Sequence, residues 1–180
     1  LWAILRIGLN DGFAQTVDEY ISCMREAVEA GNYDGAIKCS EELQRFFAKQ
    51  EDWDNYINCY HDLAWLANED HQYKAVEKYL NEAILEAKEK GVDEKGIPMS
   101  SIFNMLGKHY LSKSDYKNAI ENFNKSLEGF TDNRAELYVK RSYDDIGNAH
   151  FLKGDFDVAL QYFSRAKHHL SILVQSLTLS

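Results

Sequence analysis

A motif of about 40 residues recurs along this chain, and it constrains the fold more than any other feature. The stretch IGNAHFLKGDFDVAL, residues 146–160, aligns with LGKHYLSKSDYKNAI, residues 106–120. In this alignment Gly147 falls on Gly107. Self-similarity at such a period is the signature of a repeat protein, in which each copy adds one supersecondary unit to a stack.

Two weaker copies lie upstream and extend the repeat over most of the chain. They place Met24 and Ala64 at the position of the two glycines. The four copies then follow one another at intervals of 40, 43 and 40 residues. We therefore expect four consecutive structural units of the same kind.

Each copy is predicted to be a pair of helices joined by a tight turn. In the last copy one helical face, at the i, i+3, i+4, i+7 spacing, is formed by Tyr143, Ile146, Gly147 and His150. A Gly-Asp turn follows, and the inner face of the second helix is then formed by Phe156, Ala159, Phe163 and Ala166. Glycine costs roughly 1 kcal/mol relative to alanine inside a helix. We therefore expect Gly147 where the two helices cross, because close packing there would offset that loss.

This pattern resembles the tetratricopeptide repeat, whose signature runs from an aromatic residue and a Leu-Gly pair through a Gly-Asp-Tyr/Phe turn to an alanine, an aromatic and a final alanine. The last copy matches it at Tyr143, Ile146-Gly147, Gly154-Asp155-Phe156, Ala159, Phe163 and Ala166. The third copy matches it at Phe103, Leu106-Gly107, Tyr110, Tyr116, Ala119 and Phe123. The resemblance covers about residues 15–175. It implies an all-α, right-handed superhelical solenoid of antiparallel helix pairs with a concave groove.

The copies are longer than the family's usual repeat of about 34 residues. In this they look like the repeats of G-protein-signalling modulators, kinesin light chains and bacterial peptide-sensing regulators. The resemblance does not choose among these.

The expected helix boundaries divide the chain into three parts. Residues 1–14 would form an apolar N-terminal helix or the remnant of an upstream repeat, and residues 178–180 a tail. Between them, residues 15–177 would form four helix pairs at about 15–50, 53–90, 99–130 and 133–177. The apolar start without an initiator Met suggests a piece of a longer protein.

Composition excludes several classes of partner. The chain holds one proline, which favours an all-helical protein. Its whole net charge of −9 lies in residues 1–90, and an acidic half argues against nucleic acid and anionic membrane surfaces. No apolar run reaches the roughly 18 residues that a membrane helix needs.

The cysteines and histidines suggest neither a metal site nor a catalytic site. The cysteines, Cys23, Cys39 and Cys59, are odd in number and lack metal-ligand spacing, so we expect reduced core thiols in a cytoplasmic protein. His168-His169 and the carboxylate pairs Asp144-Asp145 and Glu41-Glu42 are interpreted as polar helix surface. Phosphate-binding glycine loops and hydrolase motifs are missing. We therefore expect a protein that is not an enzyme and uses no metal or cofactor.

The first helix of each pair is expected to line the groove with side chains that its core face does not use. These positions form a second stripe at helical spacing. The predicted partner-binding residues are Arg25, His61, Trp65, Asn68, Asn104, Lys108, Arg141, Asp144 and Asn148. An Asn amide offers both a donor and an acceptor to a peptide backbone, and a Trp side chain is a common interface anchor. A hydrated groove with incidental polar residues is the alternative reading of the same stripe.

Two functions remain open at this point. The first is a scaffold that binds a protein or a peptide in the groove. The second is a ligand-peptide-sensing regulatory module of a larger signalling or transcriptional regulator. The two would differ in the domains joined to the repeats, such as a DNA-binding region for a regulator.

The C-terminal helix carries more apolar residues than one helix stack can bury. We predict an interface there, formed by Leu170, Leu173, Val174 and Leu177. Contiguous exposed apolar surface of this kind usually marks an interaction site. The occupant would be a second copy of the chain, a bound partner or a further repeat, and the apolar N-terminal segment could play the same part at the other end.

Overall fold

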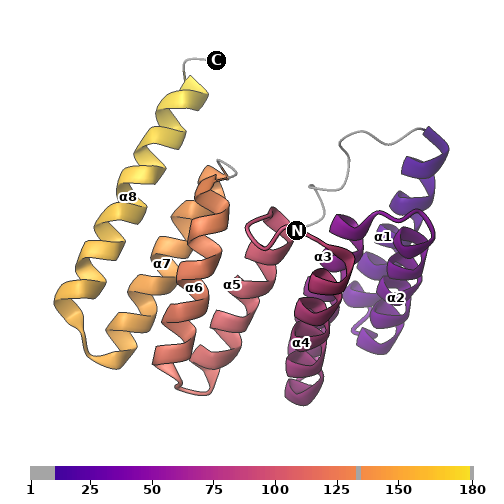
Figure 1. Ribbon diagram of the computed structural model, residues 1–180, viewed down its shortest axis with the longest axis horizontal. Coiled ribbons are helices and arrows are strands. Elements are labelled where there is room, and N and C mark those ends of the chain that lie inside the picture. Colours follow the sequence, from indigo (N-terminus) through magenta and orange to yellow (C-terminus); the bar gives the residue numbers. More distant parts are fainter. Residues whose placement is uncertain (1–10, 133–134, 179–180) are drawn as a thin grey trace. The chain divides into compact units, whose positions relative to one another are not determined.

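The computed structural model describes residues 11–132 and 135–178, and the regular secondary structure in these ranges is entirely α-helical. The helices are α1 (Asp11–Glu29), α2 (Tyr33–Lys49), α3 (Trp53–Glu69), α4 (Tyr73–Lys90), α5 (Ile97–Ser112), α6 (Tyr116–Asp132), α7 (Glu136–Lys153) and α8 (Phe156–Thr178). Figure 1 shows them as successive rods joined by short turns. The all-α prediction of paired helices is confirmed. The helix expected at residues 1–9 lies outside the described residues.

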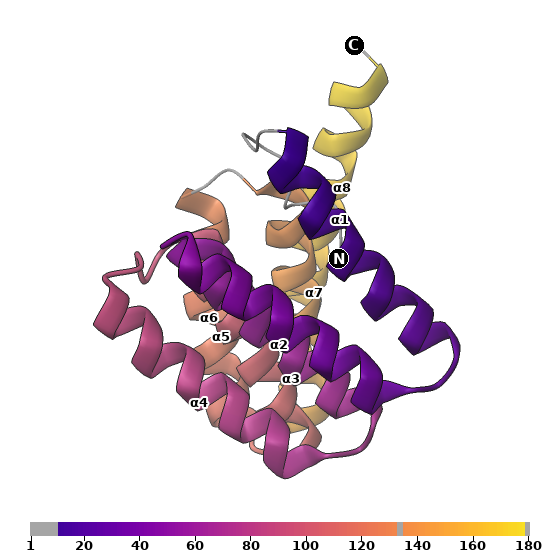
Figure 2. The ribbon, with the colours of Figure 1, turned by 90° about the vertical axis from the view of Figure 1, so that its right-hand side faces the viewer.

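The chain divides into two compact units, residues 1–90 with α1–α4 and residues 91–180 with α5–α8. Within each unit every helix packs against the next one along the chain, as Figures 1 and 2 show. None of the described helices is long and apolar enough to cross a membrane.

Side-chain caps explain where three of the helices, α2, α3 and α6, begin. Asn32 Oδ1 accepts a hydrogen bond from the backbone N–H of Gly35 at 3.0 Å at the start of α2. Asp52 makes the same contact at the start of α3, and Asp115 makes it just before α6, each at 3.2 Å. Such caps satisfy a backbone donor that has no partner inside the helix, and each contributes about 1 kcal/mol.

The turn inside each helix pair places a left-handed residue at the same position of the repeat. These residues, seven positions after the small residue of each copy, are Gly31, His71, Ser114 and Gly154, with φ of 69°, 59°, 59° and 95°. Glycine adopts this conformation without steric strain, whereas other residues rarely do. The repeat therefore conserves a backbone geometry in all four pairs, although only two of them use glycine for it.

The glycine crossing predicted from the sequence is confirmed in the second unit. A Cβ atom added to Gly147 of α7 would lie 2.7 Å from Cε1 of Phe163 in α8. One added to Gly107 of α5 would collide with the side chain of Phe123 in α6. Both glycines therefore make room for an aromatic ring of the second helix.

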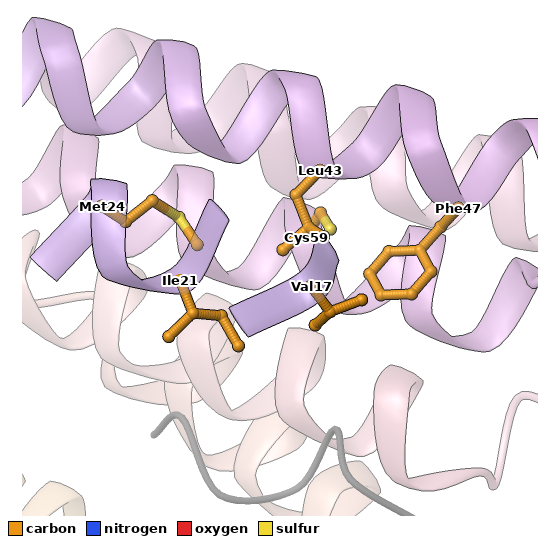
Figure 3. Close-up of a cluster of buried hydrophobic side chains, with 6 residues drawn as sticks. All are labelled: Val17, Ile21, Met24, Leu43, Phe47 and Cys59. Atoms are coloured by element: carbon orange, nitrogen blue, oxygen red, sulfur yellow. The ribbon is translucent and has the colours of Figure 1, made fainter. Parts of the chain in front are cut away.

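The first helix pair is built differently, because Met24 stands where the later pairs have glycine. Met24 is fully buried, and it belongs to a cluster of buried side chains drawn in Figure 3: Val17, Ile21, Met24, Leu43, Phe47 and Cys59. The flexible Met side chain fills the space between α1 and α2. The small-residue rule therefore holds for only part of the repeat array.

The expectation of three reduced cysteines is wrong. Cys23 of α1 and Cys39 of α2 form a disulfide, with their Cα atoms 6.1 Å apart, while Cys59 is a buried free thiol. The two bonded residues belong to neighbouring helices that face each other, a relation that their count and spacing did not reveal. Since disulfides persist in oxidising compartments, the argument from reduced cysteines to the cytoplasm no longer holds.

Candidate binding surface

The predicted groove residues fall on the first helix of each pair, and the unit boundary divides them into two sets. In the first unit they are Arg25 on α1 and His61, Trp65 and Asn68 on α3. In the second unit they are Asn104 and Lys108 on α5 and Arg141, Asp144 and Asn148 on α7. Each set is treated as a candidate surface of its own unit.

A hydrogen bond between two first helices is the central feature of the second unit's surface. Nδ2 of Asn104 in α5 donates to Oδ2 of Asp145 in α7 at 2.9 Å. Both side chains are partly buried, whereas Lys108, Arg141 and Asn148 beside them are exposed. The predicted residues Asn104 and Arg141 are thus brought to one place through Asp145.

Asp145 is the residue that the sequence interpretation missed, because it was taken as solvated helix surface. Its carboxylate instead lies against α5, and burial raises its pKa above the ordinary carboxyl value. Lys108, the Asn104 hydrogen bond and Arg141 act in the opposite direction, while the Asp144 carboxylate raises the pKa further. The surface therefore holds a partly desolvated acceptor between two cations.

Asp144 and Arg141 contact side chains of their own helix, α7. The Lys140 ammonium lies 2.5 Å from Oδ2 of Asp144, an ion pair of i,i+4 spacing. The Arg141 guanidinium lies 5.8 Å from the centre of the Tyr138 ring. Asp144 is thus paired with Lys140, while the exposed cations Lys108 and Arg141 act electrostatically on Asp145.

The first unit's candidate residues share one face of α3. His61, Trp65 and Asn68 follow the i, i+4, i+7 spacing, and Asn68 is exposed while His61 and Trp65 are partly buried. Nδ1 of His61 lies 3.3 Å from Oδ1 of Asp62. Arg25 is exposed on α1. Helical spacing, rather than direct contact, relates these side chains.

The first unit also has a cavity that sequence reasoning did not find. It measures about 340 Å³ and is lined by Glu41, Gln44, Arg45, Tyr60, Leu63, Lys78, Tyr79 and Glu82. Its residues come from the second helices α2 and α4 and from α3, and none of them is a predicted groove residue. Nε2 of Gln44 is buried there without a hydrogen-bond partner. Burial raises the pKa of both Tyr60 and Tyr79.

Comparison with known proteins identifies the repeat and its fold. Residues 98–167 match the sequence profile of the tetratricopeptide repeat. Among solved structures, BtubC (BKLC) from P. vanneervenii is similar with a TM-score of 0.72 and 19% identity, over 93% of this chain and 68% of that one. The MamA protein is similar with a TM-score of 0.53 and 18% identity, over 90% of this chain and 96% of that one. At such identities the likeness concerns the fold alone, and no curated protein sequence matched that of this chain.

Proposed function

We propose that this chain is a protein-interaction scaffold that binds a peptide on α5 and α7, because residues 98–167 match the family model of the tetratricopeptide repeat. The observation that carries the proposal is the Asn104–Asp145 hydrogen bond between these helices, with exposed Lys108 and Arg141 beside it. The repeats of this family generally serve as scaffolds rather than catalysts, and the proposal assigns no reaction to the chain.

The chemistry of this surface suits an extended peptide that carries a carboxylate. The Asn104 and Asn148 amides each offer a donor and an acceptor, as a peptide main chain requires. Asp145 accepts from N–H groups, and its partial burial strengthens such a bond. Lys108 and Arg141 supply charge-assisted hydrogen bonds for an acidic side chain or a terminal carboxylate.

The first unit offers a second candidate surface of its own, which would supply apolar contact to a ligand. We propose Trp65 as an anchor, flanked by His61 and Asn68, with Arg25 as a further cation. Aromatic side chains dominate the energies of many interfaces. The partly buried ring of Trp65 keeps some surface for a ligand to cover. This part of the proposal rests on the shared helical face, and the charge chemistry is tested separately on the second unit.

A random peptide library displayed on phage is a suitable probe, because no ligand needs to be known. Peptides selected on the wild-type chain are measured by isothermal titration against wild type and the Lys108→Ala/Arg141→Ala double variant. We expect acidic peptides and an affinity at least about tenfold lower for the variant, since each lost charge-assisted bond contributes on the order of 1 kcal/mol or more.

The matched control is Lys117→Ala/Arg165→Ala, which removes two positive charges from exposed positions of the second helices α6 and α8. Its affinity should stay within about twofold of wild type, because a distant surface charge acts only through screened electrostatics. Equal affinities for all three proteins, or selected peptides without acidic groups, would contradict the proposed surface.

A further inference from the structure

One face of α8 carries an apolar stripe that the described helices of its unit leave largely exposed, although the ring of Phe163 in this stripe also packs on Gly147 of α7. α8 is the last helix of the row α5–α8 in Figure 1. The exposed fractions are 62% for Phe156, 67% for Leu160, 37% for Phe163, 47% for Leu170 and 53% for Val174. Lys167 is also exposed and lies between Phe163 and Leu170 in this stripe. With it, the positions 156, 160, 163, 167, 170 and 174 follow one another at alternating intervals of four and three residues. Such spacing forms a continuous seam along one helix face.

The chain itself shows what this stripe looks like when it is covered. Forty residues earlier, α6 carries the equivalent side chains Tyr116, Ile120, Phe123, Leu127 and Phe130. Phe123 and Phe130 are at most 2% exposed. Ile120 and Leu127 pack against a cluster that includes Ile146 and Ala149 of α7. The two stripes therefore differ in one neighbour: the α6 stripe packs against both α5 and α7, whereas the α8 stripe meets α7 alone among the described helices of its unit.

We propose that a second copy of this chain covers the stripe, with its α8 packed antiparallel on the first α8. The order of step lengths, four-three-four-three-four, reads the same in both directions. An antiparallel pair can therefore place Phe156 opposite Val174 of the second copy and Leu160 opposite its Leu170. Phe163 then lies opposite Lys167 of the second copy. The stripe is complementary to itself in this register, as a two-fold interface requires.

Lys167 favours a second copy over a helix of the α7 kind. It stands where α6 has Leu127, and the buried side chains that α7 brings to the α6 stripe, such as Ile146 and Ala149, accept no hydrogen bond from an ammonium group. In the self-paired arrangement the Lys167 stem lies on apolar surface and its ammonium lies beside the Phe163 ring of the other copy. Lysine stems commonly pack in this way, and a cation near an aromatic face is attracted to it.

The flank and the size of the stripe are also compatible with a dimer. Next to the seam lie the exposed side chains Asp157, Ser164 and Ser171. The two serines are small and uncharged, so they allow a second helix to approach α8 closely. Five half-exposed large side chains offer on the order of 500 Å² of apolar surface. With the polar flank and Phe151, whose ring centre lies 5.4 Å from that of Phe156, the patch approaches the roughly 800 Å² per partner of a specific interface.

Sedimentation velocity of the full chain, over a wide concentration range, tests this proposal with two complementary variants. Leu160→Glu and Leu170→Lys, each alone, should weaken the wild-type dimer at least about tenfold, because a charge then faces leucine in both layers. Their equimolar mixture should restore the dimer. In the mixed antiparallel pair the new Glu and Lys side chains face each other in one layer, and Leu170 faces Leu160 in the other. A parallel pair would bring neither match.

Leu85→Glu is the matched control, since Leu85 of α4 is 69% exposed and lies outside unit 2. It should dimerise like wild type, and circular dichroism should show unchanged helix content for all variants. A wild-type chain that stays monomeric overturns the proposal, as does a dimer that survives Leu160→Glu. Mixing that restores no dimer overturns the antiparallel register. The inference is independent of the proposed peptide surface, so peptide affinity should be unchanged in Leu160→Glu.

Discussion

At the scale of single residues, the glycines at the helix crossings are the positions from which the sequence best predicts the structure. A glycine in an open helix would be improved by alanine by roughly 1 kcal/mol. Gly107 should behave in the opposite way, because the ring of Phe123 occupies the place of its missing side chain and is itself fully buried. The sign of the effect therefore distinguishes close packing from an incidental glycine.

Gly107→Ala should lower the free energy of unfolding by about 1–2 kcal/mol, since overpacking a filled core costs about 1–3 kcal/mol and exceeds the gain in helix propensity. Urea denaturation measures this. Adding Phe123→Leu should make the alanine less harmful than it is beside Phe123, a coupling that a double-mutant cycle detects. A Gly107→Ala protein more stable than wild type would show that α5 and α6 do not approach so closely.

Asp145 gives a pH-dependent prediction. Burial raises its pKa in the folded protein, so the folded state binds a proton there more tightly than the unfolded chain does. Its ionisation therefore lowers stability as the pH rises from below the ordinary carboxyl pKa through the folded-state value. Asp145→Asn should raise the urea midpoint at neutral pH, and the difference should vanish near about pH 3, where the carboxyl is protonated in both states.

The control for this experiment is Asp144→Asn, which removes an i,i+4 ion pair with Lys140 and leaves Asp145 in place. Its effect should stay within about 0.5 kcal/mol, as is usual for such pairs. If Asp145→Asn lowers the midpoint at neutral pH, then Lys108 and Arg141 stabilise the carboxylate more than burial penalises it. The candidate surface would then be part of what holds α5 and α7 together.

At the scale of helices, periodicity was sufficient to predict the element type and the pairing, because both follow from local spacing. Contacts between different helices could not be predicted from this local spacing. Gly129 lies in the last turns of α6, where a Cβ would lie 2.9 Å from the carbonyl oxygen of Lys95. No local pattern encodes this close approach. Asp145 was misread for the same reason: its partner Asn104 lies 41 residues away. A comparison of equivalent positions between repeats would have suggested that they meet.

The Cys23–Cys39 disulfide is the clearest example of such a contact between helices, and it can be tested directly. Titration of thiols in denaturant should find one free thiol before reduction and three after it, since Cys59 is free. The bond joins residues 16 apart, and a loop of this size predicts a loss of about 3 kcal/mol when it is opened. Reduced wild type and Cys23→Ser/Cys39→Ser should show the same lowered stability. Three free thiols without reductant would show that the bond does not form in solution.

At the scale of the whole molecule, the division after Lys90 has a physical consequence. In a repeat protein each element contacts only its neighbours, so stability is close to a sum of local terms. Within residues 91–180 the four helices α5–α8 pack in sequence, and the Asn104–Asp145 bond and both glycine crossings lie inside this unit. The interactions that build the proposed peptide surface are therefore all present in one half of the chain.

Residues 91–180 expressed alone should therefore fold cooperatively and keep the affinity of the full chain for peptides that depend on Lys108 and Arg141. Helical circular dichroism with a single urea transition, and titration with the phage-selected peptides, measure the two expectations. A fragment that starts at Lys108, inside α5, is the control: it lacks Phe103, Asn104 and Gly107, and it should lose both folding and binding. Unfolded material from residues 91–180 would mean that contacts with the first half complete this unit. A folded fragment without binding would mean that ligand recognition needs residues of the first unit, such as Trp65.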